Sequence, residues 1–499
     1  MPVASVVARL LPMTAFLLRT LLFCALLGAL GGCATNPVTG RQDLVFMSEQ
    51  QEIGLGQQSH QEILKRYRVY PDAGLQTYVS TVGQRVAATA HRQNLTYHFT
   101  LLDSTEINAF ALPGGYIYIT RGLLAYMNSE AELAAVLGHE LGHVTARHSV
   151  RQQSGAQAAS LGTGLLSILF PQLGYTGINQ TINLLGTALL RGYGREMELE
   201  ADGLGAEYLA RSGYDPNAML AVIGTLKNQE IFDHELAAAE GREPRAYHGL
   251  FATHPSNDTR LAEAIAAAGK FQSTRGETYR DRFLDAIDGL VFGDDPSEGV
   301  VRGKRYDHGG LGFVLDLPDG WAVENLPDRL VITAPQSAAQ IQLAAKPAGA
   351  GETPADLIRS LQLSDFTNPR PLDINGLQGV TGITRVQAGG RALPARMVAL
   401  VFGGHGYLVT GVARDPQGLS GYDPAILRFA QSFKPLSAAE RKQVKANRLR
   451  VIPRQKPLSW QTLAAGSPLR KLPEAQLRLL NAAAPDSAGP TTARVKIVD

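Results

Sequence analysis

The residues with the clearest chemical potential lie in one short segment, His139-Glu140-Leu141-Gly142-His143. Helical residues four positions apart share a face, so the two imidazoles can bind one ion. Neutral imidazole nitrogens suit zinc, and Glu140 between them can act on an activated water as a general base. The segment therefore predicts a zinc site; a pair of surface histidines is the alternative. His148, five residues past His143, lies off this face, and we expect it to be structural.

The zinc helix is expected to be buried, because an apolar stripe at helical spacing accompanies it. The stripe consists of Leu133, Val136, Leu137, Leu141 and Val144.

A catalytic zinc ion needs a third protein ligand and leaves one position open. The candidate segment is Glu198-Leu199-Glu200-Ala201-Asp202. Glu198 and Asp202 are four residues apart on a predicted helix and point the same way. We expect Glu198 to complete the ligand set and Asp202 to orient a ligand histidine. Glu200 falls on another face, where we expect it to be solvated. The alternative is an acidic helix start favoured by the helix dipole.

Hydrophobic periodicity and turn residues predict the elements that position these side chains. Helices are expected over residues 48–64, 75–88, 129–150 and 195–212, and strands over residues 96–102 and 116–120. From about Gly299 the pattern changes to short alternating strands separated by glycine-rich turns. These strands are expected at 313–317, 330–333, 341–345, 397–402 and 406–412, with helices at 354–362 and 424–432. The expected fold class is α+β.

Length and composition limit the classes of protein that remain. The chain has 499 residues, and domains of roughly 100–200 residues predict two to four of them. Hydrophobic residues make up 44% and charged residues 18%, which excludes wholesale disorder. The net charge of +2 favours no particular partner, and we expect no nucleic-acid binding. Two cysteines exclude a disulfide scaffold and a four-cysteine metal site.

The N-terminus is typical of an export signal with a lipid anchor. Two arginines precede an apolar run, which ends in Leu30-Gly31-Gly32-Cys33. The run is shorter than the ~20 residues that a transmembrane helix needs. The ending resembles the lipobox of bacterial lipoproteins, in which Cys33 would be acylated; a plain signal peptide is the alternative. Ala34 after the cysteine resembles lipoproteins sent to the outer membrane.

Several segments together resemble the gluzincin metallopeptidases of the HtpX and CAAX prenyl protease type, in particular their soluble periplasmic lipoproteins of the BepA and LoiP type. The matching segments are Cys33-Ala34-Thr35-Asn36-Pro37, Asn108-Ala109-Phe110, Pro113-Gly114-Gly115, the zinc helix, Arg195 through Asp202, and Thr253-His254-Pro255. They span about residues 33–265 in family order. The resemblance implies a mainly helical zincin-type metalloprotease domain with a small active-site sheet.

The resemblance also implies a role for each matching residue. One zinc ion per chain would be bound by His139, His143 and Glu198, with Glu140 as the base and Asp202 behind a ligand.

Two further parts of the site follow from the resemblance alone. His254 is similar to a mobile histidine that approaches the metal in a latent or a catalytic role. The stretch from Asn108 through Gly114 and Gly115 to Thr120 resembles an edge strand that pairs with an extended substrate.

The whole chain is predicted to consist of four parts in sequence order. They are a lipoprotein signal peptide at 1–32, the metalloprotease domain at 33–290, a small α+β accessory domain at 300–435 and a basic segment at 436–499. The last segment carries 12 Lys or Arg against 4 Asp or Glu, which indicates a solvated basic tail. A faint LysM-like pattern in it is the alternative. Residues 152–190 contain no charged residue and are expected to form buried or lid segments beside the site.

The combined prediction is a zinc endopeptidase of the bacterial periplasm, anchored to the outer membrane through Cys33. Its substrates would be misfolded or stalled envelope proteins, and its partners the outer-membrane assembly machinery or peptidoglycan. The alternative is a chaperone-like lipoprotein with a latent zinc site that assists outer-membrane protein assembly. Glu140 favours the enzyme, because a binding protein has no need of that base.

Overall fold

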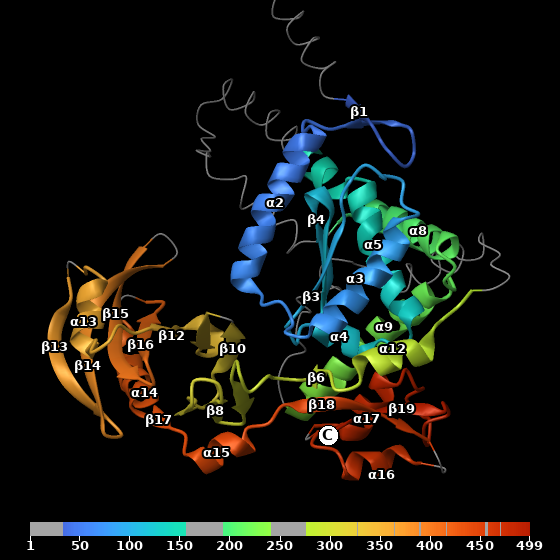
Figure 1. Cartoon of the computed structure of the whole chain (residues 1–499). Coiled ribbons are helices and arrows are strands. Elements are labelled where there is room, and N and C mark those ends of the chain that lie inside the picture. The colour runs from blue at the N-terminus through green and yellow to red at the C-terminus, as the bar shows by residue number, and fades with distance from the viewer. Residues whose placement is uncertain are drawn as a thin grey trace, which may run out of the picture. The chain divides into compact units, whose positions relative to one another are not determined.

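The structure, a computed structural model, describes residues 33–155, 193–240 and 276–499, apart from 327, 364, 389–390, 416, 455–457 and 470. The chain divides into two compact units. Unit 1 consists of Met1–Lys65, Val69–Asp288 and Arg450–Ile497, and unit 2 of Arg66–Arg68, Gly289–Leu449 and Val498–Asp499. Both units mix helices and sheets (Figure 1), as the α+β prediction requires.

Unit 1 begins with an antiparallel pair of short strands, β1 (Cys33–Thr35) and β2 (Gln42–Leu44). The backbone turns between them because Asn36 Oδ1 accepts hydrogen bonds from two following amides. Helices α2 (Glu49–Arg66) and α3 (Ala73–Ala87) follow. Asp72 caps α3 by accepting a hydrogen bond from the Leu75 amide at 2.9 Å.

A small sheet forms one wall of the region around the predicted zinc helix. It contains β3 (His98–Leu102), β4 (Ala109–Leu112) and β5 (Tyr116–Thr120), in the order β3-β5-β4. β3 runs parallel to β5, and β4 runs antiparallel to it. β4 is therefore an edge strand among the described residues.

The turn between β4 and β5 requires glycine. Gly115 in the short helix η1 (Pro113–Gly115) has φ +96°, and a Cβ there would lie 2.3 Å from the Thr96 carbonyl oxygen.

Two closely packed helices carry most of the predicted site residues. After α4 (Arg121–Tyr126), helix α5 (Glu130–Thr145) is buried at every one of its 16 residues. It packs on α8 (Arg195–Arg211) through glycines. A Cβ on Gly142 would lie 3.0 Å from the Ala201 carbonyl, and one on Gly205 would lie 3.1 Å from the His139 amide. The small residues therefore let the two helix backbones approach closely.

The first residue of α5 joins several elements of unit 1. The buried Glu130 carboxylate accepts hydrogen bonds from Tyr78 and Tyr214 at 2.6 and 2.7 Å, and it pairs with Arg282. Tyr78 belongs to α3 and Arg282 to α12 (Arg280–Ile287); α9 (Ala218–Glu240) completes this part. These contacts fix where the zinc helix begins.

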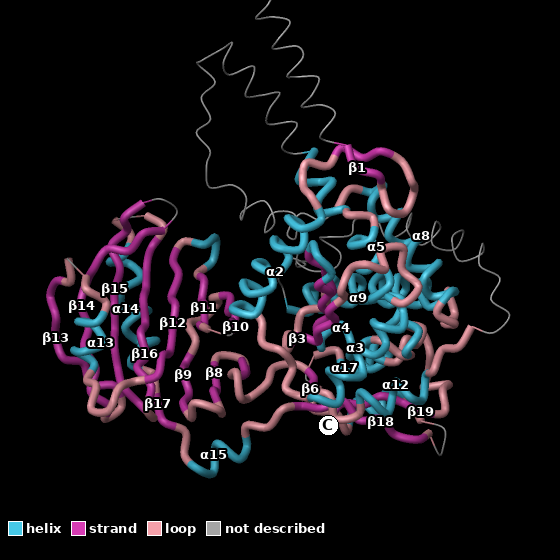
Figure 2. Tube along the Cα trace, turned by 45° about the horizontal axis from the view of Figure 1, so that its top comes forward, coloured by secondary structure: helices cyan, strands magenta, loops and turns pink. Residues whose placement is uncertain are grey.

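The last part of the chain returns to unit 1. It contains α16 (Trp460–Ala465), α17 (Pro473–Leu480) and the strands β18 (Asn447–Pro453) and β19 (Arg494–Val498). Both views show α17, β18 and β19 beside α12 (Figures 1 and 2). Lys496 is fully buried, and its Nζ donates to the carbonyl oxygens of Ala125 and Met127 at 2.8 and 2.6 Å.

The expectation of a solvated basic tail is therefore wrong for residues 450–497. Trp460, Leu477, Leu480 and Val495 are fully buried, and burying them outweighs the high local charge. Some of the basic side chains form ion pairs: Arg494 contacts Asp285 at 2.5 Å, and Arg478 contacts Glu474 at 2.9 Å. The LysM-like alternative and the domain boundaries remain predictions.

Unit 2 is built on a seven-stranded antiparallel sheet with a helix on each face (Figure 2). Val398 and Leu400 pack in the main core with α14 (Leu419–Gln431), whereas Met397 and Ala399 face α13 (Pro354–Ser360). The strands, in spatial order, are β10 (Ala322–Leu326), β11 (Arg329–Thr333), β12 (Ala339–Pro347), β16 (His405–Ala413), β15 (Arg391–Phe402), β14 (Leu377–Ala388) and β13 (Thr367–Ile374).

A four-stranded sheet completes unit 2. Its strands, in spatial order, are β17 (Lys434–Pro435), β9 (Phe313–Asp316), β8 (Arg305–His308) and β7 (Val300–Arg302). The short strand β6 (Val291–Phe292) pairs with the first residues of β18, and α15 (Ala438–Gln443) precedes β18. Most predicted elements of this unit are present with shifted ends.

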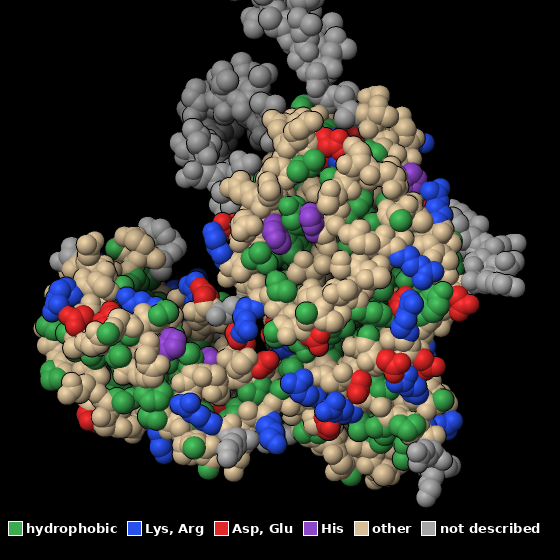
Figure 3. Space-filling view, viewed as in Figure 1, with side chains coloured by type: hydrophobic (Ala, Val, Ile, Leu, Met, Phe, Trp, Pro, Cys, Tyr) green, Lys and Arg blue, Asp and Glu red, His purple; other side chains and the backbone are tan. Residues whose placement is uncertain are grey.

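Two surface features concern possible partners. Among the described residues, no helix has both the length and the hydrophobicity that crossing a bilayer requires. On the face drawn in Figure 3, Lys and Arg are interspersed with Asp and Glu instead of forming one patch. The expected lipobox lies mostly, and its upstream signal wholly, outside the described residues.

Candidate metal centre

Helices α5 and α8 bring three predicted metal ligands together. One nitrogen each of His139 and His143 and a carboxylate oxygen of Glu198 all lie within 4.8 Å of one another. The two Nε2 atoms are 3.0 Å apart, and each lies 3.7 Å from a Glu198 oxygen. All three side chains are buried. Two imidazoles and a carboxylate at these separations form a donor set that fits a zinc ion.

Asp202 lies behind the first histidine, at the position expected from its spacing. Its Oδ1 is 2.8 Å from His139 Nδ1, and its side chain is 2% exposed. A carboxylate at Nδ1 favours a proton on that nitrogen and leaves Nε2 as the donor toward the metal. Both ends of the His139 ring therefore have the partners that metal binding requires.

Glu140 and an unpredicted aromatic residue complete the inner surroundings. Glu140 is 1% exposed and lies on α5 between the two histidines. The Tyr193 ring stacks on the His143 ring with centroids 4.1 Å apart and planes 20° apart. Burial raises the pKa of Tyr193, so its hydroxyl stays protonated and can bond to Ser149 Oγ at 2.5 Å. Nothing in the sequence pattern pointed to Tyr193.

The second histidine has its own outer partners, which the sequence did not predict. His143 Nδ1 is 2.8 Å from His148 Nδ1, and His148 Nε2 is 3.1 Å from a Glu200 oxygen. Arg151 donates to the same oxygen at 2.7 Å. The expectation that Glu200 is solvated is wrong: it is about one-fifth exposed and paired on α8.

The charges of this pair follow from its surroundings. Burial lowers the pKa of His148, so that imidazole is neutral near pH 7. Burial alone would raise the pKa of Glu200, but the hydrogen bonds from His148 and Arg151 outweigh it and lower the value to about 2. A neutral imidazole thus lies between a metal-ligand candidate and a fixed negative charge.

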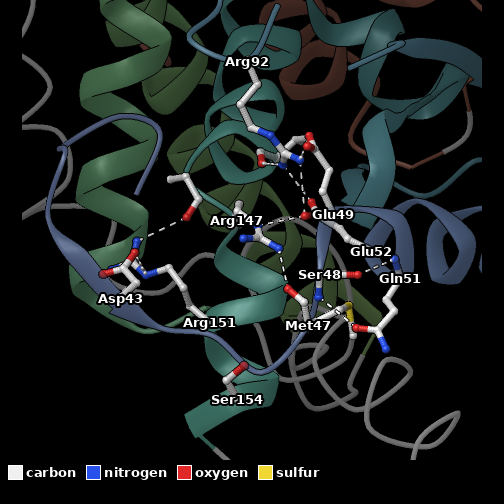
Figure 4. Close-up of polar contacts among 12 residues, drawn as sticks. Asp43, Met47, Ser48, Glu49, Gln51, Glu52, Arg92, Arg147, Arg151 and Ser154 are labelled. Carbon is white, nitrogen blue, oxygen red and sulfur yellow. Dashed lines mark hydrogen bonds and ion pairs between the residues drawn. The ribbon is translucent and has the colours of Figure 1, made fainter. Parts of the chain in front are cut away.

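Residues of β2, α2 and the segment between them contact the residues that follow the zinc helix (Figure 4). Arg147 donates to Glu52 and to the Met47 carbonyl at 2.8 and 2.9 Å, and Arg92 pairs with Glu52 at 2.8 Å. Farther along, Arg151 Nε lies 3.3 Å from Asp43. Asp43 and Met47 are therefore connected to Arg151 and Arg147, which follow the end of α5.

The predicted substrate strand lies near the cluster. A pocket is lined by Ala111 and Leu112 of β4, Pro113 of η1, and His143 and Tyr193. Asn108 precedes β4, and Gly114 and Gly115 form the turn after it. Residues 152–190 were expected to form buried or lid segments beside the site, and the structure describes only 152–155 of them. His254 lies outside the described residues.

Comparison with known proteins finds similar sequences for this region. Residues 74–268 match the model of Peptidase family M48. The beta-barrel assembly-enhancing protease of Escherichia coli (strain K12) is 29% identical over 300 residues, which are 58% of this chain and 56% of that protein. The mitochondrial metalloendopeptidase OMA1 of Schizosaccharomyces pombe is 30% identical, over 45% of this chain and 63% of that protein. The chain thus spans a little over half the length of these curated relatives.

A solved structure also matches, without adding to the assignment. The cyanobacterial PsbP from Synechocystis sp. PCC 6803 is 14% identical and covers 28% of this chain and 98% of its own, with a TM-score of 0.22. A score this low carries no argument. The family resemblance predicted from the sequence is confirmed by the matching family model and relatives.

Proposed function

We propose that this chain, which carries a domain of Peptidase family M48 over residues 74–268, is a zinc-dependent endopeptidase. The observation that carries the proposal is the convergence of His139, His143 and Glu198 within 4.8 Å in a buried site. The family match and relatives named as proteases support the same reaction class.

In this proposal each residue of the site has a separate role in peptide hydrolysis. The two histidines and Glu198 would hold the ion. Zinc bound there supplies polarisation of the scissile carbonyl and lowers the pKa of water. Glu140 takes the proton from that water and passes it to the leaving amine. Asp202 keeps the His139 ring in the orientation that binds the ion.

The substrate would bind as an additional strand on β4. That strand has a free edge among the described residues, and the pocket beside it reaches His143. Backbone pairing along Asn108–Leu112 would accept extended, unfolded chains with little regard for sequence. The Gly114–Gly115 turn fixes the end of this strand. We propose that His254 keeps the free enzyme latent by approaching the zinc site.

The site of action we propose is the periplasm, with Cys33 acylated and held in the outer membrane. The basic and apolar N-terminal run that ends at Cys33 supports this location. The substrates would be misfolded or stalled envelope proteins. A relative named beta-barrel assembly-enhancing protease supports a connection with outer-membrane protein assembly.

The variant Glu140→Gln tests the reaction. It keeps the three proposed ligands but removes the base, so zinc content should stay near one per chain. Cleavage of an unfolded model protein should fall by about 10²–10⁴-fold. Glu62→Gln is the control, because Glu62 is an exposed glutamate of the same unit, paired only with Lys65 on the surface in the described contacts. Wild-type cleavage by Glu140→Gln would overturn the proposed mechanism.

A further inference from the structure

We propose that His148, Glu200 and Arg151 are positioning residues for the metal ligand His143, and that Asp43 completes this chain from the N-terminal segment. We define the N-terminal segment as residues 33–48. The inference rests on the proposed metal site but concerns metal affinity instead of peptide cleavage. It makes the strength of the metal site depend on the residues that directly follow Cys33.

The hydrogen bonds allow only one arrangement that suits a metal. His143 must present an unprotonated Nε2 to the ion, so its proton resides on Nδ1. That N–H donates to His148 Nδ1 at 2.8 Å, and His148 therefore carries its own proton on Nε2. This second N–H donates to Glu200 at 3.1 Å. A carboxylate can only accept at this position, so Glu200 sets the direction of both bonds.

The reverse arrangement would prevent metal binding. If a donor replaced the Glu200 acceptor, His148 Nε2 could accept a hydrogen bond and its proton would move to Nδ1. That N–H would then point at His143 Nδ1 and place the His143 proton on Nε2, the atom that faces the other ligands. The negative charge of Glu200 excludes this state, in the same way that Asp202 does for His139.

Arg151 connects this carboxylate to the N-terminal segment. One Arg151 nitrogen donates to Glu200 at 2.7 Å, and another lies 3.3 Å from Asp43 (Figure 4). Asp43 lies on β2 and also accepts from Asn36 at 2.8 Å, so it is fixed by the β1–β2 hairpin. The guanidinium is thus held at two ends, which limits the positions that Glu200 can adopt.

The same segment stabilises the bend that brings His148 back to His143. Arg147 has φ +56°, a conformation that costs a residue with a Cβ about 1 kcal/mol or more. Its side chain bonds to the Met47 carbonyl and to Glu52, which compensates that cost. Phe46 is connected as well, because its amide donates to Ser154 at 3.1 Å. Independent contacts therefore attach residues 43–47 to residues 147–154, which follow α5.

The first experiment compares two glutamates of α8 with similar surroundings. Glu200 contacts His148 and Arg151, whereas Glu207 contacts His91 and Arg211, which are not among the proposed ligands. We expect Glu200→Gln to weaken zinc binding by about 10–100-fold, measured by competition with a chromophoric chelator. Glu207→Gln should bind zinc as the wild type does. The visible spectrum of the Co²⁺-loaded protein should change in Glu200→Gln alone, which a purely structural role would not produce.

The second experiment tests the outer end of the chain. Asp43→Asn should weaken zinc binding by about two- to fivefold, the scale of one partly exposed ion pair. Asp285→Asn is the control, because Asp285 pairs with Arg494 elsewhere in unit 1. The double variant Asp43→Asn/Glu200→Gln should lose less affinity than the two single effects multiplied together, since both act through Arg151.

The outcomes separate this inference from the proposed function. Unchanged zinc affinity in Glu200→Gln, with a folded protein by circular dichroism, would overturn the positioning role. Multiplicative effects of the two substitutions would overturn the part assigned to Asp43. A wild-type protein that binds zinc without cleaving any peptide would reject the proposed function but leave the affinity predictions standing. A wild-type protein that binds no zinc would reject both.

Discussion

Helix α5 of unit 1 and the main core of unit 2, on one face of its seven-stranded sheet, are both buried, but they bury different kinds of side chain. Every residue of α5 is buried, including the charged or titratable Glu130, Glu132, His139, Glu140 and His143. The main core of unit 2 is formed by apolar side chains, with Ile332, Ile341 and Leu400 at 0% exposure.

The buried polar side chains of α5 serve the proposed metal site, whereas the apolar side chains of unit 2 serve stability. A buried polar group costs free energy unless it has a partner, so α5 is tied to partners on α3, α8 and α12. An apolar core needs no hydrogen-bond partners, only side chains whose volumes fill the space between them. Substitutions in α5 should therefore act first on metal binding, and substitutions in the unit 2 sheet should act on stability alone.

The largest expected effect is the loss of a proposed ligand. Glu198→Gln should weaken zinc binding by more than the 10–100-fold that outer partners contribute, because an anionic donor is removed from the cluster. Glu196→Gln is the matched control, since Glu196 is exposed on the same helix. Isothermal titration with Zn²⁺ measures both. Equal affinities of the two variants would remove Glu198 from the site.

The next effect tests the other side of the comparison. Ile341→Ala removes a fully buried side chain from the unit 2 core and should destabilise that unit by about 2–5 kcal/mol. Zinc affinity should stay at the wild-type value. Ile231→Ala, at an isoleucine 45% exposed on α9, should change stability by less than about 0.5 kcal/mol. A loss of zinc binding in Ile341→Ala would contradict the separation of roles.

A buried charge in unit 1 gives a pH-dependent test. Burial lowers the pKa of Lys496 to about 7, against about 10.4 in an unfolded chain. Between these values the unfolded chain binds more protons, so this group makes stability rise with pH from about 7 to 10. Lys496→Met should remove that rise, whereas Lys65→Met, at an exposed lysine, should keep it. Urea unfolding at several pH values measures the slope; identical slopes for all three proteins would exclude a buried neutral lysine.

The smallest effect compares the same helix cap in the two regions. Ser129 caps α5 in a buried setting, and Ser437 caps α15 in an exposed one; each accepts from an amide three residues on at 3.2 Å. Replacing a capping serine by alanine costs about 0.5–2 kcal/mol. We expect Ser129→Ala near the upper value and Ser437→Ala near the lower one by urea unfolding. The reverse order would show that burial does not govern the cost.

Local sequence patterns were enough to predict the inner part of the site. The spacing of His139 and His143, and of Glu198 and Asp202, depends only on the helical repeat, and the structure places all four side chains together. Their functional roles stay predictions. Helix α8 was expected over 195–212 and spans Arg195–Arg211, because Gly213, which has φ +80°, is a local signal for its end.

The outer partners of His143, which are His148 and Glu200, could not be predicted, because no local sequence signal marks the bend that brings them together. Helix α5 was expected to reach residue 150, but it ends at Thr145, and Arg147 then adopts a positive φ. In an uninterrupted helix His148 would face away from His143, so its position could not be derived from spacing. Glu200 was expected in solvent for the same reason, since its partners come from beyond this bend.

The prediction of a solvated basic tail was wrong for a different physical reason. A composition rich in Lys and Arg says nothing about which side chains find partners. Lys496 is satisfied by carbonyls of Ala125 and Met127, and Arg494 by acids of α12, contacts that only the tertiary fold creates.

Unit 1 is formed by segments that are far apart in the sequence, so its contacts form at different times during synthesis. Lys496 bonds to Ala125 across 371 residues of sequence, and the residues between include all the strands of the large sheet. A ribosome adding about 5–20 residues per second needs roughly 20–75 s to make that stretch. Contacts so distant in sequence also form slowly. During synthesis, Ala125 and Met127, which precede the zinc helix, can therefore gain their contact with Lys496 only after strand β19 has been made.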